Sequence, residues 1–295
     1  MKTLIEFSFS TDKFNAIPDA PKHLVTKANY MATSILVDRD TPEFTSLWKW
    51  ARAHQEARAL SPSPSYIYSK AELDAAEIFY LPLIHAAPDQ FGGSIDYGTK
   101  YRTVQKSGRF EVKEQISPLF TDTNQLSKTR EFQQLLSDEV LINKRLADIL
   151  AEHHIQGYEL LPVFRPKRIR RWAEDVEVRN SEGVQSLNWF QLNVTAVAGP
   201  IAQPPTVFGP DFLFLEPSHT GRNQVKKLGL VGSPKIGTQL YFHRSGFPHT
   251  DIVRTKELNI SEIPHPYILI TQKLYRIFKE NKVKLFEVRP AYFVD

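Results

Sequence analysis

Five side chains with catalytic chemistry lie close together near the C-terminal end of the chain: His243, Arg244, Ser245, His249 and Asp251. Serine, histidine and aspartate are the groups of a hydrolytic triad, and two histidines are potential metal ligands. However, triad members usually come from separate segments, no nucleophile elbow surrounds Ser245, and two histidines are too few for a convincing metal site. A polar turn is therefore the first interpretation, and a nucleic-acid- or phosphate-processing enzyme that uses His243 and His249 is the alternative.

Two other segments contain residue types found in ligand sites. Residues 232–237 (GSPKIG) lack the GxxxxGK[ST] spacing of a phosphate loop, and Pro234 has no N–H to offer a phosphate. We expect an ordinary loop there. His153 and His154 are adjacent potential metal ligands, but a solvated helix end is the better interpretation, because histidine also suits the helix dipole at that end.

Residues 165–171 (RPKRIRR) form the densest cluster of charge, with five cations in seven residues, and Glu174, Asp175 and Glu177 follow closely. One interpretation is a solvent-exposed face on which these acids offset the cations. The other is an electrostatic contact with an acidic partner or a phosphate backbone, with Trp172 as an interface anchor. On the second interpretation, the predicted partner-binding residues are Arg165, Lys167, Arg168, Arg170, Arg171 and Trp172.

The composition excludes several kinds of site. Among 295 residues there is no cysteine, which rules out disulfides, thiolate zinc sites and cysteine nucleophiles and fits a reducing compartment. The formal net charge of +4 is weak support for an acidic partner. The sequence shows neither a secretion signal nor a segment long enough to cross a membrane. We therefore expect a cytoplasmic protein with no cofactor, no bound metal and no membrane partner; the sequence leaves its oligomeric state open.

A sequence repeat indicates which elements position these residues. Residues 140–164 and 268–292 align without a gap at an offset of 128 and share apolar positions, two glutamates and a terminal proline. Each copy predicts a short strand, a helix capped by the side-chain oxygen of Asn143 or Thr271, and a second strand. A weaker upstream echo relates 129–132 to the segment that starts at Thr255.

The remaining chain predicts alternating strands and short helices. Residues 1–9 have the pattern of a strand, 44–60 that of a helix, and 61–65 (SPSPS) that of a stiff connector. We therefore expect a mixed α+β protein in which two related strand–helix–strand modules are joined by additional antiparallel strands. The expected division is an N-terminal region at 1–125 and a C-terminal region at 126–295 with the second module; one continuous domain is the alternative.

Several short segments, in their order, resemble a known family. They are 71–76 (AELDAA), 212–217 (FLFLEP), 245–247 (SGF), 251–254 (DIVR) and 268–288. Together they resemble the double-CxxCG-motif immunity proteins of bacterial swarm-inhibition toxin systems, in patches over 70–295. The resemblance implies a protein that binds and neutralises a cognate toxin domain in competition between bacteria, without catalysis.

The cysteines that give this family its name are missing. Residues 85–89 and 242–245 stand roughly where the cysteine motifs would lie, so the zinc that the family implies cannot be carried over. If the kinship holds, apolar packing replaces the metal, which a domain of this size can support. We therefore expect a toxin-binding immunity protein; the enzyme described above remains the alternative, and nucleic acid is the less favoured partner.

Overall fold

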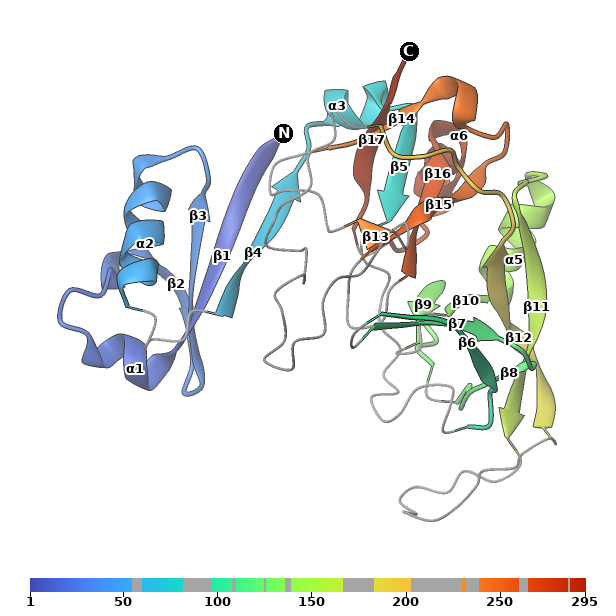
Figure 1. Cartoon of the computed structure of the whole chain (residues 1–295), viewed down its shortest axis with the longest axis horizontal. Coiled ribbons are helices and arrows are strands. Elements are labelled where there is room, and N and C mark those ends of the chain that lie inside the picture. The colour runs from blue at the N-terminus through green and yellow to red at the C-terminus, as the bar shows by residue number, and fades with distance from the viewer. Residues whose placement is uncertain are drawn as a thin grey trace. The chain divides into compact units, whose positions relative to one another are not determined.

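Alternation of apolar and polar residues at the N-terminus produces the first strand, as predicted. β1 (Lys2–Ser10) buries every second side chain, among them Ile5, Phe7 and Phe9. This period of two is that of a strand with one face against a core. The strand belongs to a four-stranded sheet of order β2-β3-β1-β4 (Figure 1). Its neighbours are β2 (Val25–Ala28), β3 (Ala32–Asp38) and β4 (Leu60–Ile67).

The structure is a computed structural model. The residues it describes are 1–54, 60–81, 97–107, 110–124, 126–135, 139–166, 183–202, 230–231, 239–259, 265–285 and 287–295. They form two compact units, Met1–Ala75 and Ala76–Asp295. The boundary lies fifty residues before the expected division at 125/126, because the strand that follows Ala76 is a central strand of a C-terminal sheet. Within the described ranges, no helix is both long and apolar enough to cross a membrane.

Two helices cover the buried face of the first sheet. They are α1 (Thr11–Ala16) and α2 (Pro42–Ala53), and the short 3-10 turn Lys22–Leu24 precedes β2. Aromatic pairs join the helices to β1: Phe9 with Phe14 at 5.3 Å, Phe7 with Trp48 at 5.9 Å, and Phe9 with Trp50 at 5.5 Å between ring centroids. Edge and tilted contacts of this kind add to the free energy gained by burying the rings.

The expected connector at 61–65 is instead part of β4, at the edge of this sheet. β4 runs antiparallel to β1, with Pro64 opposite Ile5 and Ser63 opposite Glu6. Proline has no N–H to give a partner strand, so it occurs in strands mainly at sheet edges. Pro62 and Pro64 are two residues apart and therefore place their nitrogens on the same side of the strand, which leaves the alternate residues free to pair.

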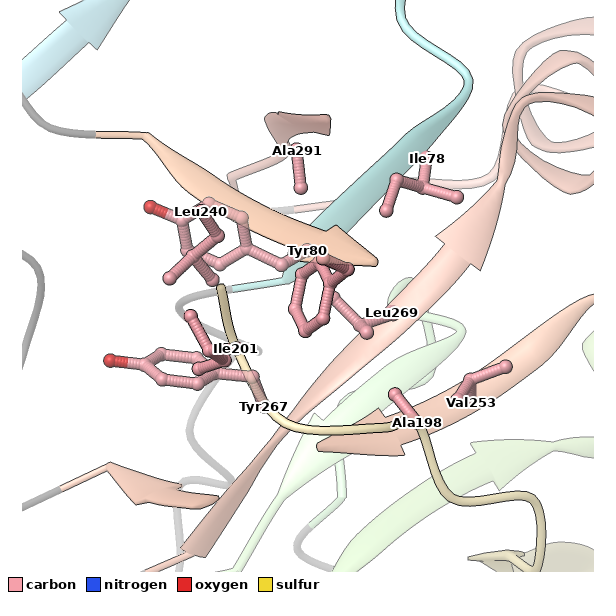
Figure 2. Packing of buried hydrophobic residues seen from close by; sticks show 10 residues of the cluster. Ile78, Tyr80, Ala198, Ile201, Leu240, Val253, Tyr267, Leu269 and Ala291 are labelled. Atoms are coloured by element: carbon pink, nitrogen blue, oxygen red, sulfur yellow. The ribbon is translucent and has the colours of Figure 1, made fainter. Parts of the chain in front are cut away.

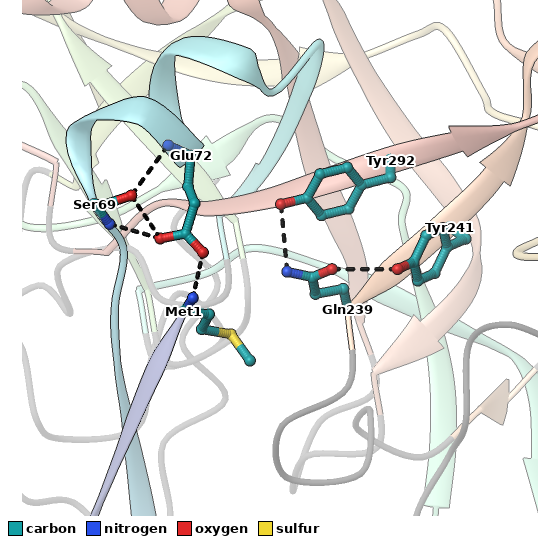
Figure 3. Close-up of polar contacts among 6 residues, drawn as sticks. All are labelled: Met1, Ser69, Glu72, Gln239, Tyr241 and Tyr292. Carbon is teal, nitrogen blue, oxygen red and sulfur yellow. Dashed lines mark hydrogen bonds and ion pairs between the residues drawn. The ribbon is translucent and has the colours of Figure 1, made fainter.

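A polar network ties the start of the first unit to its end. In α3 (Lys70–Ala75), Glu72 accepts a hydrogen bond from the amino group of Met1 and from the backbone N–H and hydroxyl of Ser69, the last two at 2.7 and 2.9 Å (Figure 3). Ser69 Oγ in turn accepts from the Glu72 N–H at 3.2 Å, which completes a capping box. The amino group of Met1, followed by the Ser69 N–H, lowers the pKa of Glu72 to about 2.

In its described residues, the second unit has three sheets and two α-helices, α5 (Lys144–Glu152) and α6 (Gln272–Glu280). A five-stranded sheet has the order β8-β11-β12-β10-β9, a six-stranded sheet has the order β13-β15-β16-β5-β17-β14, and β6 pairs with β7 (Figure 1). Together with the first unit, this confirms the mixed α+β class. The strands are β5 (Ile78–Leu81), β6 (Tyr101–Ser107), β7 (Phe110–Gln115), β8 (Leu119–Phe120), β9 (Phe132–Gln134), β10 (Val140–Asn143), β11 (Tyr158–Pro166), β12 (Gly183–Val194), β13 (Leu230–Val231), β14 (Leu240–His243), β15 (Ile252–Asn259), β16 (His265–Thr271) and β17 (Arg289–Val294).

The predicted repeat is confirmed in both copies. β10, α5 (Lys144–Glu152) and β11 form the first copy, and β16, α6 (Gln272–Glu280) and β17 form the second. The predicted caps are also present: Asn143 Oδ1 accepts from the Leu146 N–H at 2.9 Å, and Thr271 Oγ1 accepts from the Leu274 N–H at 3.4 Å. The two strands of each copy run parallel, and an antiparallel strand from elsewhere in the chain lies between them.

Both helices end in the same unusual way. His154 and Lys282, at equivalent positions, adopt positive φ angles of 51° and 53°. The N–H of the next residue, Ile155 or Val283, bonds back to the carbonyl of Leu150 or Phe278 five residues earlier, at 2.9 and 2.8 Å. These bonds define a Schellman end, a position where glycine is the usual left-handed residue. The histidine pair thus lies at a helix end, as the favoured interpretation expected.

The core of the six-stranded sheet gathers side chains from distant parts of the chain (Figure 2). Figure 2 shows Ile78, Tyr80, Leu240, Leu269 and Ala291 converging with the others of the cluster. The segment 196–202 crosses this face of the sheet and contributes two further members of the cluster, Ala198 and Ile201.

Candidate partner-binding site

A paired arm of β11 and β12 carries the start of the basic segment. The two strands are paired up to their ends, where Arg165 lies opposite Val184 and Pro166 lies opposite Gly183. Gly183 is closely packed, because a Cβ atom there would lie 2.9 Å from the carbonyl oxygen of Arg165 and 3.0 Å from the Phe120 ring. The pairing of the described strands therefore ends at Pro166 and Gly183.

A bulge in β12 places an apolar side chain on the surface of this arm. The register shifts between Pro162 opposite Phe190 and Phe164 opposite Gln185, so several residues of β12 have no opposite residue on β11. Ser186 Oγ accepts the N–H groups of Asn188 and Trp189, at 3.3 and 3.1 Å. Bulges commonly redirect a side chain in this way.

Two aliphatic side chains of the arm face solvent. Leu187 is 77% exposed and Val184 is 64% exposed, whereas Trp189 next to the bulge is buried in the core with Leu141 and Val163. Residues directly opposite each other in a pair of strands project to the same face, so Val184 lies beside Arg165. The arm thus presents exposed apolar side chains and a cation on two paired strands.

Arg165 is oriented by its neighbours but remains accessible. Its Nε lies 3.8 Å from Asp122 Oδ1, and about half of its side chain is exposed whereas Asp122 is nearly buried. With the Asn124 amide turned so that its oxygen faces the guanidinium, Arg165 donates two hydrogen bonds to it, at 2.8 and 3.1 Å. Such fixed partners lower the entropy that a side chain loses on binding.

Of the six predicted partner-binding residues, the structure describes Arg165, which lies at the end of the arm. The other five, Lys167, Arg168, Arg170, Arg171 and Trp172, lie outside the described residues, as does the glycine-containing segment 232–237. Sequence reasoning missed Val184 and Leu187. Their signal was faint, since both are single apolar residues in a polar stretch, and Leu187 lies in the bulge that begins at Ser186.

The polar residues considered for catalysis have structural partners in the second unit. Arg244 forms two hydrogen bonds with the Glu77 carboxylate, at 2.9 and 2.7 Å, and these lower the pKa of Glu77. Asp251 lies 3.3 Å from Lys273 Nζ and accepts the N–H of Gln156 at 3.1 Å.

The two histidines lie near these residues. His243 ends β14, the 3-10 turn Arg244–Gly246 follows it, and both His243 and His249 are exposed. In the described part of the chain, no three histidine, aspartate or glutamate residues cluster as metal ligands would. The polar turn favoured from the sequence describes this region.

Two tyrosines lie side by side near one edge of the six-stranded sheet. Tyr241 and Tyr292 lie opposite each other on the parallel strands β14 and β17, with ring centroids 5.6 Å apart. Figure 3 shows Gln239 joining them: its Nε2 donates to the Tyr292 hydroxyl at 3.3 Å, and its Oε1 accepts from Tyr241 at 3.2 Å. The rings contact each other and are half-buried, so this group stabilises the sheet edge.

The first unit has an exposed apolar pair of its own. Tyr30 and Met31, at the tip of the β2–β3 hairpin, are 86% and 67% exposed. Asn29 Oδ1 accepts the N–H groups of Met31 and Ala32, both at 2.8 Å, which fixes the turn. Among the described residues, no charged side chain held by a hydrogen bond or ion pair lies beside this tip. The arm differs, because Arg165 is held there next to exposed apolar side chains.

No protein-family model matches the chain, and no curated protein matches it. The resemblance to double-CxxCG-motif immunity proteins therefore stays a prediction. Of the segments that carry it, 251–254 leads into β15, 268–288 spans α6, and 71–76 covers most of α3. The segment 212–217 lies outside the described residues, as does 85–89.

Proposed function

We propose that this protein is a cytoplasmic immunity protein that binds a cognate toxin domain through the β11–β12 arm and blocks it without chemistry of its own. The observation that carries the proposal is the position of Val184 and Leu187, exposed on a paired strand arm beside an oriented arginine. Arginine is one of the residue types enriched among the side chains that supply most of the binding energy of an interface, and the exposed aliphatic pair beside it would gain free energy on removal from water.

Charge indicates the chemistry of the partner. Arg165 lies at the end of the β11–β12 arm, and four further cations follow it in the sequence between 167 and 171. Complementary charge chiefly raises the association rate and is sensitive to salt. The favoured partner is therefore a protein domain with an acidic surface around an apolar centre, and in the immunity hypothesis that domain is the toxin.

The test uses the full chain and the protein encoded by the neighbouring gene. The two should copurify, and Leu187→Asp should weaken their equilibrium affinity by about fivefold or more, which is the effect of losing an interface anchor that contributes more than about 1 kcal/mol. Tyr30→Asp is the matched control, because Tyr30 is equally exposed but lies in the other unit. The Tyr30→Asp variant should bind the partner protein with the affinity of the wild type.

The charge component has a separate readout. Exchanging Arg168 and Arg170 for Glu should slow association several-fold at low salt and leave the melting temperature nearly unchanged, whereas Lys22→Glu in the first unit should change neither. Equal association rates in all variants would contradict a role for the basic segment. Tight binding of generic RNA that the same double variant abolishes would favour the nucleic-acid-processing alternative instead.

A further inference from the structure

We infer that the second unit consists of two copies of one module that have exchanged their central strands, so that its two large sheets unfold together. The sheets have the same arrangement. Five strands of the first sheet, β9-β10-β12-β11-β8, correspond in order to β15-β16-β5-β17-β14 of the second, with β13 added at one edge. In both, the last pair in this order is parallel and the other pairs are antiparallel.

The hydrogen-bond register of the two sheets agrees residue by residue. Phe190 of β12 lies opposite Ile142 and Pro162. Phe79 of β5 lies opposite Ile270 and Pro290, which are the repeat equivalents of these two residues. A shift of one residue would turn every side chain of a strand to the other face, so this agreement fixes the same faces toward the core in both sheets.

The two cores use the same positions. In the first sheet, the buried cluster contains Leu119, Leu141, Val163 and Trp189. The register makes these the equivalents of four members of the second cluster, which are Leu240, Leu269, Ala291 and Ile78. Shared backbone pairing and shared core positions together identify two copies of one module.

The central strands are exchanged between the copies. β5 precedes β8, β9, β10, α5 and β11 in the chain, but it lies in the sheet formed by β14 to β17. β12 precedes β14, β15, β16, α6 and β17, but it lies in the sheet formed by β8 to β11. With the exchange, both copies have one chain order, with the central strand first. A simple insertion of one module into the other would require a permuted order in one of them.

Reciprocal polar contacts join the copies across the exchange. The Glu131 carboxylate accepts the Lys284 N–H at 3.1 Å, and at the equivalent place Asp251 accepts the Gln156 N–H at 3.1 Å. Each carboxylate also pairs with a cation of its own copy, Arg145 at 2.6 Å for Glu131 and Lys273 at 3.3 Å for Asp251.

The backbone repeats this correspondence. The Glu131 carbonyl accepts from Asn143 and the Asp251 carbonyl accepts from Thr271, both at 3.0 Å. The same contact made in both directions is the mark of a twofold-related pair. Glu131 and Asp251 are therefore equivalent. The sequence had instead suggested that 129–132 corresponds to the segment that starts at Thr255, and that alignment is wrong.

Amide hydrogen exchange on the full chain tests this inference. Leu146 of α5 and Leu274 of α6 are equivalent and fully buried, so Leu146→Ala and Leu274→Ala form a matched pair. Each should lower the protection of the slowest amides in β10 and in β16 by the same factor, on the order of 100-fold. The inference would be overturned if Leu146→Ala lowered protection in β10 alone, or if Leu274→Ala lowered it in β16 alone.

The control is Ile5→Ala, a fully buried residue of the first unit, which should leave the protection of β10 and β16 unchanged. An equal loss from this variant would also overturn the inference, because the coupling would then belong to the whole chain. If either leucine variant does not fold, the milder pair Ile149→Val and Ile277→Val keeps the comparison, with an expected loss of about five- to tenfold in both strands.

Cleavage of the native chain gives a second readout. A protease site introduced into 167–182 cuts between β11 and β12, so that each piece retains the central strand of the sheet formed by the other. After cutting, the pieces should migrate together in native size-exclusion chromatography and separate only in denaturant. Pieces that separate under native conditions would contradict the exchange.

Discussion

Glycine substitution at the left-handed ends of α5 and α6 should stabilise the second unit. His154 and Lys282 have φ angles of 51° and 53°. A Cβ atom in this region crowds the following carbonyl and costs about 1–2 kcal/mol. Glycine avoids that cost but loses about 0.5–1 kcal/mol more backbone entropy on folding. The difference predicts a gain of about 0.5–1 kcal/mol in the free energy of unfolding for His154→Gly and for Lys282→Gly.

Both side chains are exposed, so their removal leaves no cavity. The gain should appear in urea unfolding as a higher midpoint with an unchanged dependence on denaturant, because the surface exposed on unfolding stays the same. In a unit of about 200 residues, the melting temperature should rise by about 2–4 °C per kcal/mol. Combining the two substitutions should roughly add their effects.

His153→Gly is the matched control. His153 precedes His154 at the same helix end but has a φ of −91°, which any residue adopts without strain. Glycine there should lower the free energy of unfolding by about 0.5–1 kcal/mol through the entropy term alone. If His154→Gly destabilised the protein as His153→Gly does, the reasoning from the left-handed conformation would be refuted.

Four further substitutions have expected effects on stability that differ in sign. Gly157 has a φ of +102°, and a Cβ there would lie 2.0 Å from the Ile252 carbonyl oxygen, so Gly157→Ala should lower the urea midpoint by the equivalent of about 3 kcal/mol or more. Because folding lowers the pKa of Glu72 to about 2, its carboxylate stabilises the first unit at neutral pH, and this contribution is lost as the pH falls from about 5 toward 2. Glu72→Gln should therefore unfold at lower urea than the wild type at pH 7 and converge with it near pH 2. The buried Thr121 hydroxyl has no hydrogen-bond partner among the described residues, so Thr121→Val should be neutral or stabilising by up to about 1 kcal/mol, whereas Thr99→Val, which removes two bonds to Phe120, should cost about 1–3 kcal/mol.

Local signals made the strand–helix–strand modules predictable. The caps at Asn143 and Thr271, the helical spacing of the apolar residues and the breaks after each helix all act within a few residues. Short-range signals of this kind can be recognised in a single sequence. They are sufficient to predict the two modules and the mixed α+β class without any tertiary contact.

Long-range pairing was not predictable in the same way. The sequence of β5 is IFYL, and that of the equivalent part of β12 is WFQL. The two tetrapeptides share two residues, and neither contains a feature that indicates which sheet it joins. The repeat therefore suggested two complete modules rather than exchanged strands. At 61–65, proline and serine predicted a connector, but pairing with β1 made the segment an edge strand.

The candidate site also has one part that the sequence predicts and one part that depends on long-range pairing. The density of cations between 165 and 171 was visible in the sequence, and the structure places Arg165 on a supported arm. The exposed pair Val184 and Leu187 could not be foreseen, because alternation alone does not locate a bulge. Whether the arm binds a toxin remains the proposal that copurification tests.

The position of β5 has a consequence for synthesis on the ribosome. Roughly 190 residues separate β5 from β16, so at about 5–20 residues per second β5 waits on the order of 10–40 s for its partner strands. All four of its side chains are buried in the finished sheet. During translation, this apolar strand must therefore remain unpaired or in temporary contacts while the intervening module is made. The earliest strand of the second unit reaches its native neighbours only when β16 and β17 have left the exit tunnel.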